Sequence, residues 1–426
     1  MEQKENRRSF LSKGLAATAA GVASVTSSAW ASRPGAAPSN RPFVTEVPGK
    51  TIIGCYSSAD QILKQPKFID ALQQKLGVNA LIVHHPIKMP DWLKEMNPLG
   101  ANRHMHVSHT DDDSGLVSAI EETHRRGMDF WLYYSGHHFR EESRHIMGET
   151  FEGIKFIDLP LIKYALAHSE YTACFERPAV KEWETAVFGY GAKNYDVDNM
   201  YVTHHRYATP SFWSNLFGCA CPDCRAAAAN LGYDFPGMRD SMLSLRRRLE
   251  RLDKKTVGQF AASGMTFMDI LGALGENNGV LDWLYFRAKV VGNSLRRIHD
   301  SVHAASNHRS GFITDTHGAT MSLWVGHNWQ DFIEGASDGF HPLSWAMWQY
   351  VSVIASWANQ LCQWVPGLEE PTALKLVISF FGWEDIGLPD KRIADLKVEE
   401  AEPKDGTYNP RMTAFYENLG PERLIK

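Results

Sequence analysis

The stretch VDNMYVTHHRY, Val197–Tyr207, decides the fold that we predict for this chain. Its first part is a nearly continuous apolar run, which is typical of a β-strand buried on both faces. Two histidines and an arginine, His204, His205 and Arg206, follow the run directly. Ionisable side chains at the end of a buried strand indicate a functional site, so the same pattern in other segments points to further residues of that site.

Six other segments show short apolar runs of the same kind. They are Thr51–Tyr56, Val78–His85, Met128–His138, Gly311–His317, Asp338–Trp348 and Leu374–Asp385. Stretches with apolar residues at helical spacing separate the runs, for example Val280–Ala305. Repeated strand and helix units with nearly continuous apolar strands favour a parallel sheet covered by helices.

The number of units favours a closed barrel. Seven strands fit an α/β fold of the (β/α)8 TIM-like barrel type with insertions better than an open sheet, because no glycine-rich phosphate-binding turn follows the first strand. The position of the eighth strand stays open. We predict a single barrel domain that carries the function and covers residues 51–426.

The composition excludes some classes of protein. The chain has 426 residues, of which 44% are hydrophobic and 22% charged, as in an ordinary globular protein. Its 44 Lys and Arg against 49 Asp and Glu give a formal net charge of -5. A phosphate backbone favours a basic partner, so we expect no nucleic acid among the partners.

The first residues predict an export signal. Asn6–Lys13 carries a pair of arginines, and a run rich in Ala and Gly follows, up to a small-x-small cleavage site at Ala29–Ala31. We predict that residues 1–31 address the chain to the twin-arginine export machinery and that residues 32–50 form a flexible linker. The protein would then be periplasmic or secreted, without a stable membrane span; a retained membrane helix is the weaker alternative.

Polar side chains collect at the ends of the predicted strands. In a parallel barrel these ends meet at one rim, where the active site lies. One histidine at such a place is more often a packing residue than a ligand, but ionisable groups at six strand ends favour a shared site. We predict that substrate is bound there by His84, His137, His138, His204, His205, Arg206, His317, His341, Trp324 and Trp383.

Several blocks in order resemble secreted bacterial glycoside-hydrolase-like barrel proteins. The blocks are ERPAVKEWE, YDVDNMYVTHHRY, SNLFGCACPDCRAAAANLGYDFPGM, LDWLYFRAKVVGNSLRRIH and GFITDTHGATMSLWVGHNWQDFIEGASDGFHPLSWAMW, within Thr172–Trp348. The resemblance implies a barrel fold, a carbohydrate substrate and hydrolysis by carboxyl groups, with no cofactor.

The resemblance also points to catalytic residues. Asp315 matches the family's aspartate in the last block, and Glu384 is our second candidate because it ends the predicted strand Leu374–Asp385. One carboxyl would protonate the leaving oxygen while the other attacks the anomeric carbon or activates water. The chain departs from the family at Thr203, where the family has an aspartate before the arginine of the fourth strand.

Two other functions stay open. A metal-dependent hydrolase, lyase or isomerase would hold a divalent zinc, manganese or iron ion with imidazole and carboxylate ligands. Its ligands would come from His84, His137, His204, His205, Asp315 and His317. The third possibility is a carbohydrate-binding barrel that has lost hydrolysis, which the departure at Thr203 favours.

Three cysteines, Cys219, Cys221 and Cys224, form a C-x-C-x-x-C cluster. A four-thiolate zinc site needs one more ligand, which the local sequence does not provide. The other three cysteines are scattered along the chain. We expect the cluster to brace the loop after the fourth strand, as zinc ligands, as a disulfide or as reduced packing residues.

Overall fold

A computed structural model describes most of the chain from Ile52 onward. The described residues are 52–100, 105–136, 143–159, 172–207, 216–275, 278–317, 319–342, 347–384 and 387–396, without the side chains of 319–320 and 341–350. The predicted export signal (1–31) and linker (32–50) lie outside them, so this division of the chain stays a prediction. No helix of the described part is long and apolar enough to cross a membrane.

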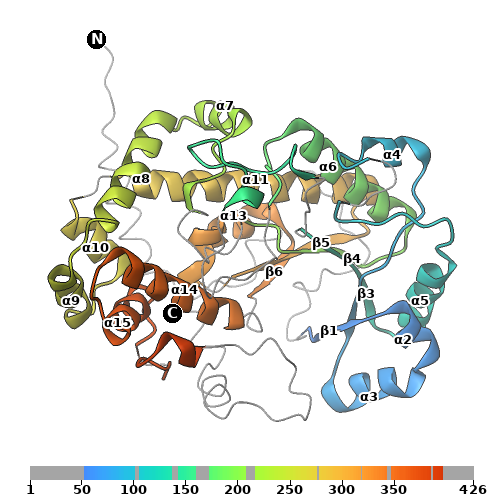
Figure 1. Ribbon diagram of the computed structural model, residues 1–426. Coiled ribbons are helices and arrows are strands. Elements are labelled where there is room, and N and C mark those ends of the chain that lie inside the picture. Colours follow the sequence, from blue (N-terminus) through green and yellow to red (C-terminus); the bar gives the residue numbers. More distant parts are fainter. Residues whose placement is uncertain are drawn as a thin grey trace. The chain divides into compact units, whose positions relative to one another are not determined.

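Six parallel strands form one sheet in chain order (Figure 1). They are β1 (Gly54–Ser57), β2 (Ala80–Val83), β3 (Asp129–Ser135), β4 (Asn199–Thr203), β5 (Gly311–Thr316) and β6 (Gly339–Pro342). In the register of the sheet, Tyr133 lies opposite Tyr201, and Asp315 lies opposite His341. These strands confirm the predicted α/β fold with a parallel sheet.

Helices lie between consecutive strands along the chain and also follow β6. They are α2 (Ala59–Lys64), α3 (Pro66–Leu76), α4 (Asp91–Met96), α5 (Ser114–Arg125), η2 (Phe156–Asp158), α6 (Pro178–Asn194), α7 (Pro222–Asn230), α8 (Phe235–Leu249), α9 (Lys254–Ala262), α10 (Phe267–Ala273), α11 (Gly279–Ser306), α12 (Ala319–Ser322), η4 (Leu323–Val325), α13 (Trp329–Asp331), η5 (Phe332–Ala336), α14 (Met347–Trp364), α15 (Glu370–Phe380) and η6 (Ile393–Leu396). The helix expected at Val280–Ala305 is confirmed in α11.

The sheet curls toward one face. The hydroxyl oxygens of Tyr56 on β1 and Tyr201 on β4 are 3.1 Å apart, and the two ring centroids are 6.4 Å apart. Strands three positions apart in a flat sheet would be separated by about 14 Å, so this contact is expected only where the sheet bends around the tyrosines. The strands thus form the curved half of a barrel with Tyr56 and Tyr201 on its concave face.

The opposite, convex face of the sheet is covered by helices. Phe188 of α6 contacts Tyr134 of β3 and Phe312 of β5, with ring centroids 5.7 and 6.1 Å apart. Gly191 of α6 allows a close approach, because a Cβ there would lie 2.8 Å from Cε of Met200 in β4. Side chains alternate between faces along a strand, so the other positions are left for the concave face.

The strand predicted at Leu374–Asp385 is wrong, because its first residues belong to helix α15. Pro371 lies in the first turn of this helix, where its fixed φ suits a helix and its missing N–H costs nothing. The positions 374, 377, 378 and 381 are buried, which is the spacing of one helical face. A continuous apolar run can form either element. The described residues therefore contain six strands, and closure into a full (β/α)8 barrel stays a prediction.

A carboxylate ties the amino end of β5 to α11. Asp338, just before β6, accepts hydrogen bonds from the backbone N–H of Phe312 at 2.8 Å and from Nε2 of His303 at 2.6 Å and His299 at 3.2 Å. Burial opposes the charge of Asp338, but the bonds from the two histidines outweigh it and lower its pKa. Burial also opposes the charge on His299, whose pKa is nevertheless raised by the bond to Asp338.

The same device occurs two strands earlier. Asp198, just before β4, accepts hydrogen bonds from the backbone N–H of Phe130 in β3 at 2.8 Å and from Nε2 of His124 in α5 at 2.7 Å. In both cases an aspartate joins the preceding strand to the helix that leads into it. These carboxylates lie at the amino ends of the strands, away from the predicted rim, and we assign them to stability.

We predict that Asp338→Asn destabilises the protein by roughly 2 to 3 kcal/mol at pH 7, because bonds between charged groups are lost. The lowered pKa means that the carboxylate stabilises the fold above about pH 4, the pKa of an unfolded aspartate, and that this contribution is lost at lower pH. Urea unfolding at pH 7 and pH 3.5 measures both effects. Asp240→Asn, in an exposed ion pair with Arg239, is the control and should change stability by less than about 0.5 kcal/mol; an equal effect of both variants would contradict the assignment.

Candidate functional site

The concave face of the sheet is lined with aromatic rings. Tyr133 lies 5.3 Å from Tyr56 and 5.5 Å from Tyr201 between ring centroids, and Trp131 lies 6.1 Å from Tyr201. Tyr56 is 45% exposed, whereas Tyr201 and Trp131 are buried beneath it. The rings therefore form a surface that solvent reaches at Tyr56 and that continues down to the sheet.

Asp315 lies at the carboxyl end of β5 on this face and is fully buried. Its carboxylate accepts a short hydrogen bond from the hydroxyl of Thr203, at the end of β4. The backbone N–H of His204 donates to both of its oxygens, at 3.0 and 3.1 Å. The carboxylate is thus held by the end of β4. Thr203, which donates to it, is the position where this chain departs from the family that it resembles.

The tyrosines beside Asp315 are held in the protonated form. Burial raises the pKa of Tyr56 to about 12, and the charge of Asp315 acts in the same direction. Burial and the same carboxylate raise the pKa of Tyr133 and Tyr201 above the ordinary value. Protonated phenols can donate hydrogen bonds, so this face offers donors as well as flat apolar rings.

Several predicted residues do lie together at this end of the sheet. His84 is exposed and contacts Tyr133, with ring centroids 5.9 Å apart. Arg206 and His317 are fully buried near Asp315, and burial together with the charge of Arg206 lowers the pKa of His317 well below its usual range. His204 is partly exposed and has a φ of 58°. The structure thus brings together residues that are far apart in the sequence.

His205, by contrast, lies behind the sheet. Its Nε2 is 3.0 Å from the hydroxyl of Ser294, which donates to Glu184 at 3.2 Å, and His106 contacts the same carboxylate at 3.0 Å. All four side chains are buried. Burial lowers the pKa of His205 to about 4. Burial opposes the charge of Glu184, but His205 and His106 beside it outweigh burial and lower its pKa. This arrangement braces the strand end rather than facing the concave side.

The predicted tryptophans lie among the helices. Trp324 packs against Phe267 and Phe380, with ring centroids 4.6 and 5.3 Å apart, and Trp383 lies 6.1 Å from Phe381. Both tryptophans are more than 90% buried. Glu384 is exposed in the turn after α15, where no strand ends, so the reason for pairing it with Asp315 is lost.

Three predicted residues remain undescribed at the side-chain level. His137 and His138 lie outside the described residues, as does the side chain of His341, whose backbone lies opposite Asp315 in β6. Their assignment to substrate binding stays a prediction.

Sequence reasoning missed the tyrosines and His327. Tyr56, Tyr133 and Tyr201 occupy strand positions of the same parity as Asp315, which was the available signal. His327 is buried 6.4 Å from His317 between ring centroids, and burial lowers its pKa to about 4. It lies outside any strand, so no pattern marked it.

Two groups of side chains in the described part of the chain have ligand atoms close enough to hold a metal ion. One is His299, His303 and Asp338, whose hydrogen bonds to one another and to Phe312 join α11 to β5. The other consists of Cys174, Cys219, Cys221 and Cys224. Neither group contains a described member of the proposed histidine and Asp315 ligand set.

No family model matches the chain, and no curated protein sequence matches it. Among solved structures, the chain is similar to the glycoside hydrolase domain of PgaB (BpsB) from Bordetella bronchiseptica, at 10% identity and a TM-score of 0.40, over 74% of this chain and 83% of that one. It is also similar to the catalytic domain of a β-amylase from Paenibacillus polymyxa, at 12% identity and a TM-score of 0.37, over 87% and 97%.

A third similar structure is the GH20 exo-β-N-acetylglucosaminidase from Vibrio harveyi, at 11% identity and a TM-score of 0.35. The match covers 69% of this chain and spans only 41% of that protein. At these identities and TM-scores the three structures carry no argument about the activity of this chain, which rests on its own residues.

We predict that the protein loses stability as the pH falls below about 6.5, the pKa of an unfolded histidine. His205 and His327 have pKa values of about 4 in the folded protein, so the unfolded chain binds more protons between pH 6.5 and 4. Each would account for about 3 kcal/mol across that interval. Urea unfolding from pH 7.5 to 4.5 measures the slope.

The variant His327→Gln should flatten this pH dependence. The matched control is His145→Gln, at an exposed histidine. A wild-type stability that stays constant from pH 7.5 to 4.5 would show that these imidazoles titrate normally.

Proposed function

We propose that the protein is an exported glycoside-hydrolase-like enzyme that binds a carbohydrate on the concave face of the sheet. The observation that supports this proposal is the location of Asp315 beside Tyr56, Tyr133 and Tyr201. Aromatic faces suit the apolar faces of sugar rings, and phenol hydroxyls and a carboxylate suit their hydroxyl groups.

The contacts of Asp315 suggest its role. Both oxygens accept hydrogen bonds from the backbone N–H of His204, directly after β4, so the carboxylate is oriented before any substrate arrives. A preoriented acceptor suits a nucleophile or a base at the anomeric carbon better than a group that donates a proton. Asp315 is buried, so a bound sugar would have to reach it past Tyr56 and Tyr133.

The proton donor is a separate assignment. Glu384 stays a prediction for this role, although its expected strand is a helix. Of the two histidines after β4, His204 is the one beside Asp315, to which its backbone N–H donates. The substitution of Thr203 for the family's aspartate also supports a second function, a barrel that binds carbohydrate without cleaving it. Here Asp315 would hold the end of β4 and accept a sugar hydroxyl.

We predict that Asp315→Asn lowers kcat at least about 100-fold while sugar binding is retained. The measurement is turnover on a panel of methylumbelliferyl glycosides and reducing-end release from polysaccharides, with thermal unfolding to verify the fold. Tyr56→Ala should instead weaken binding about tenfold, because an exposed stacking ring is removed. Asp240→Asn is the surface control. Sugar binding without turnover in the wild type would favour the binding barrel, and unchanged turnover in Asp315→Asn would exclude the catalytic assignment.

Export is tested separately. We predict that the double variant Arg7→Lys, Arg8→Lys stays inside a bacterial host that has a twin-arginine pathway, because this pathway reads the arginine pair. The wild-type chain should be found outside the cytoplasm with Ser32 as its first residue. Arg33→Lys, beyond the predicted cleavage site, is the matched control, and export of the double variant at the wild-type level would contradict the signal.

A further inference from the structure

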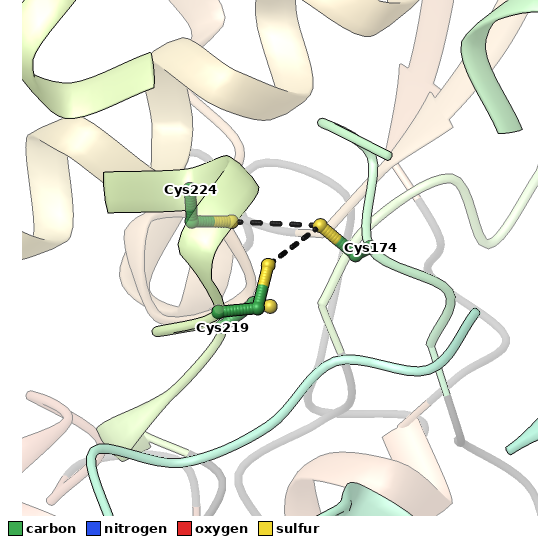
Figure 2. A group of neighbouring side chains, drawn as sticks. Cys174, Cys219 and Cys224 are labelled. Atoms are coloured by element: carbon green, nitrogen blue, oxygen red, sulfur yellow. Dashed lines mark hydrogen bonds between the residues drawn. The ribbon is translucent and has the colours of Figure 1, made fainter. Parts of the chain in front are cut away.

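Four cysteine sulfur atoms lie close together at the start of α7. The sulfur of Cys174 is 3.3 Å from that of Cys221 and 3.6 Å from that of Cys224, and with Cys219 all four lie within 4.8 Å of one another. Figure 2 shows the side chains of Cys174 and Cys224 pointing toward each other from separate segments. All four cysteines are fully buried.

We propose that Cys174, Cys219, Cys221 and Cys224 bind a structural zinc ion as four thiolates. Cys174 is the ligand that the local C-x-C-x-x-C sequence lacks, and it comes from a segment 45 positions before Cys219. Zinc with thiolate ligands at about 2.3 Å in a tetrahedron places the sulfur atoms about 3.8 Å apart, close to the distances found here. A closed set of four protein ligands is typical of structural rather than catalytic zinc.

The sulfur distances argue against simple alternatives. A disulfide needs about 2.05 Å between sulfur atoms, and each sulfur here has more than one sulfur neighbour. Four reduced thiols packed together would gain little over four apolar side chains, because thiols are weak hydrogen-bond donors and acceptors. A shared ion explains why four cysteines from two segments converge on one point.

Basic side chains adjoin the cluster, which suits a zinc ion with four thiolates because that group carries a net negative charge. Arg287 is fully buried, and its charge interacts with Cys219 and Cys224. Its guanidinium also lies 4.2 Å from the ring centroid of Tyr207. Arg177 interacts with Cys174 and Cys221. A buried arginine needs a nearby negative group, and the thiolates supply one.

The position of the cluster indicates what the zinc would stabilise. Phe175, next to Cys174, packs on His205 and Tyr207, with ring centroids 4.7 and 5.5 Å apart. The backbone of Cys174 is held by a hydrogen bond from its N–H to the carbonyl of Ile146. Zinc would therefore lock the Cys174 segment onto the start of α7 and, through Phe175, fix the loop that carries His204 and Arg206.

The test begins with metal analysis of the full chain, produced with zinc and dialysed against a weak chelator. We expect stoichiometric zinc by mass spectrometry, and release of that zinc when p-chloromercuribenzoate modifies the thiols. Production with cobalt instead should give the intense visible bands and thiolate charge-transfer band of tetrahedral cobalt. Because this uses the unmodified chain, it holds even where a cysteine variant fails to fold.

The variant Cys174→Ser should lower zinc content at least tenfold and speed amide hydrogen exchange at least tenfold around Phe175 and Tyr207. The matched control is Cys362→Ser, at a cysteine outside the cluster, which should retain zinc and exchange as in the wild type. Wild-type protein that is folded without stoichiometric metal would overturn the proposal, whether its four cysteines are alkylated as free thiols or recovered as disulfide-linked peptides.

Discussion

The bond between the ends of β4 and β5 is the contact on which the site depends. Asp315 accepts from Thr203 and from the backbone of His204, so one carboxylate fixes the end of the neighbouring strand. The curl of the sheet then brings Tyr56 from β1 over the same place. Without that bend the rings and the carboxylate would lie on a flat surface, and no shared pocket would be expected from residues so far apart in the chain.

The end of β4 serves both faces of the sheet. Thr203 points to the concave side, whereas His205, after the left-handed turn at His204, reaches the buried Glu184 and Ser294 behind it. Residues 203 and 205 would share one face of a continuing strand, so the left-handed backbone at His204 is what turns His205 to the other side. Adjacent histidines at this strand end therefore do not all face one substrate. His205 supports the strand end from the helix side of the sheet.

The sequence predicted those features that depend on local pattern. Apolar runs located six strands, because a strand buried on both faces has a nearly continuous apolar sequence. Helical spacing located α11, because a helix buried on one face repeats apolar residues every three or four positions. The strand predicted at Leu374–Asp385 is wrong because its apolar run fits a buried strand and a buried helix equally well, and only its packing decides between them. The strand-end argument for Glu384 was lost with that run, and its catalytic role stays a prediction. Cys174 and the tyrosine surface depend on contacts between distant segments, which no local pattern contains.

Charge is distributed differently at the two ends of the strands. At the amino ends, Asp198 and Asp338 pair with histidines, and these bonds outweigh the cost of burial. At the carboxyl ends, burial lowers the pKa of His205, His317 and His327, so these imidazoles are neutral at pH 7. The carboxylates at the amino ends join strands to helices, whereas Asp315 at the carboxyl ends lies beside the tyrosines of the concave face. A sugar, which is itself neutral, suits such a surface better than an anion does.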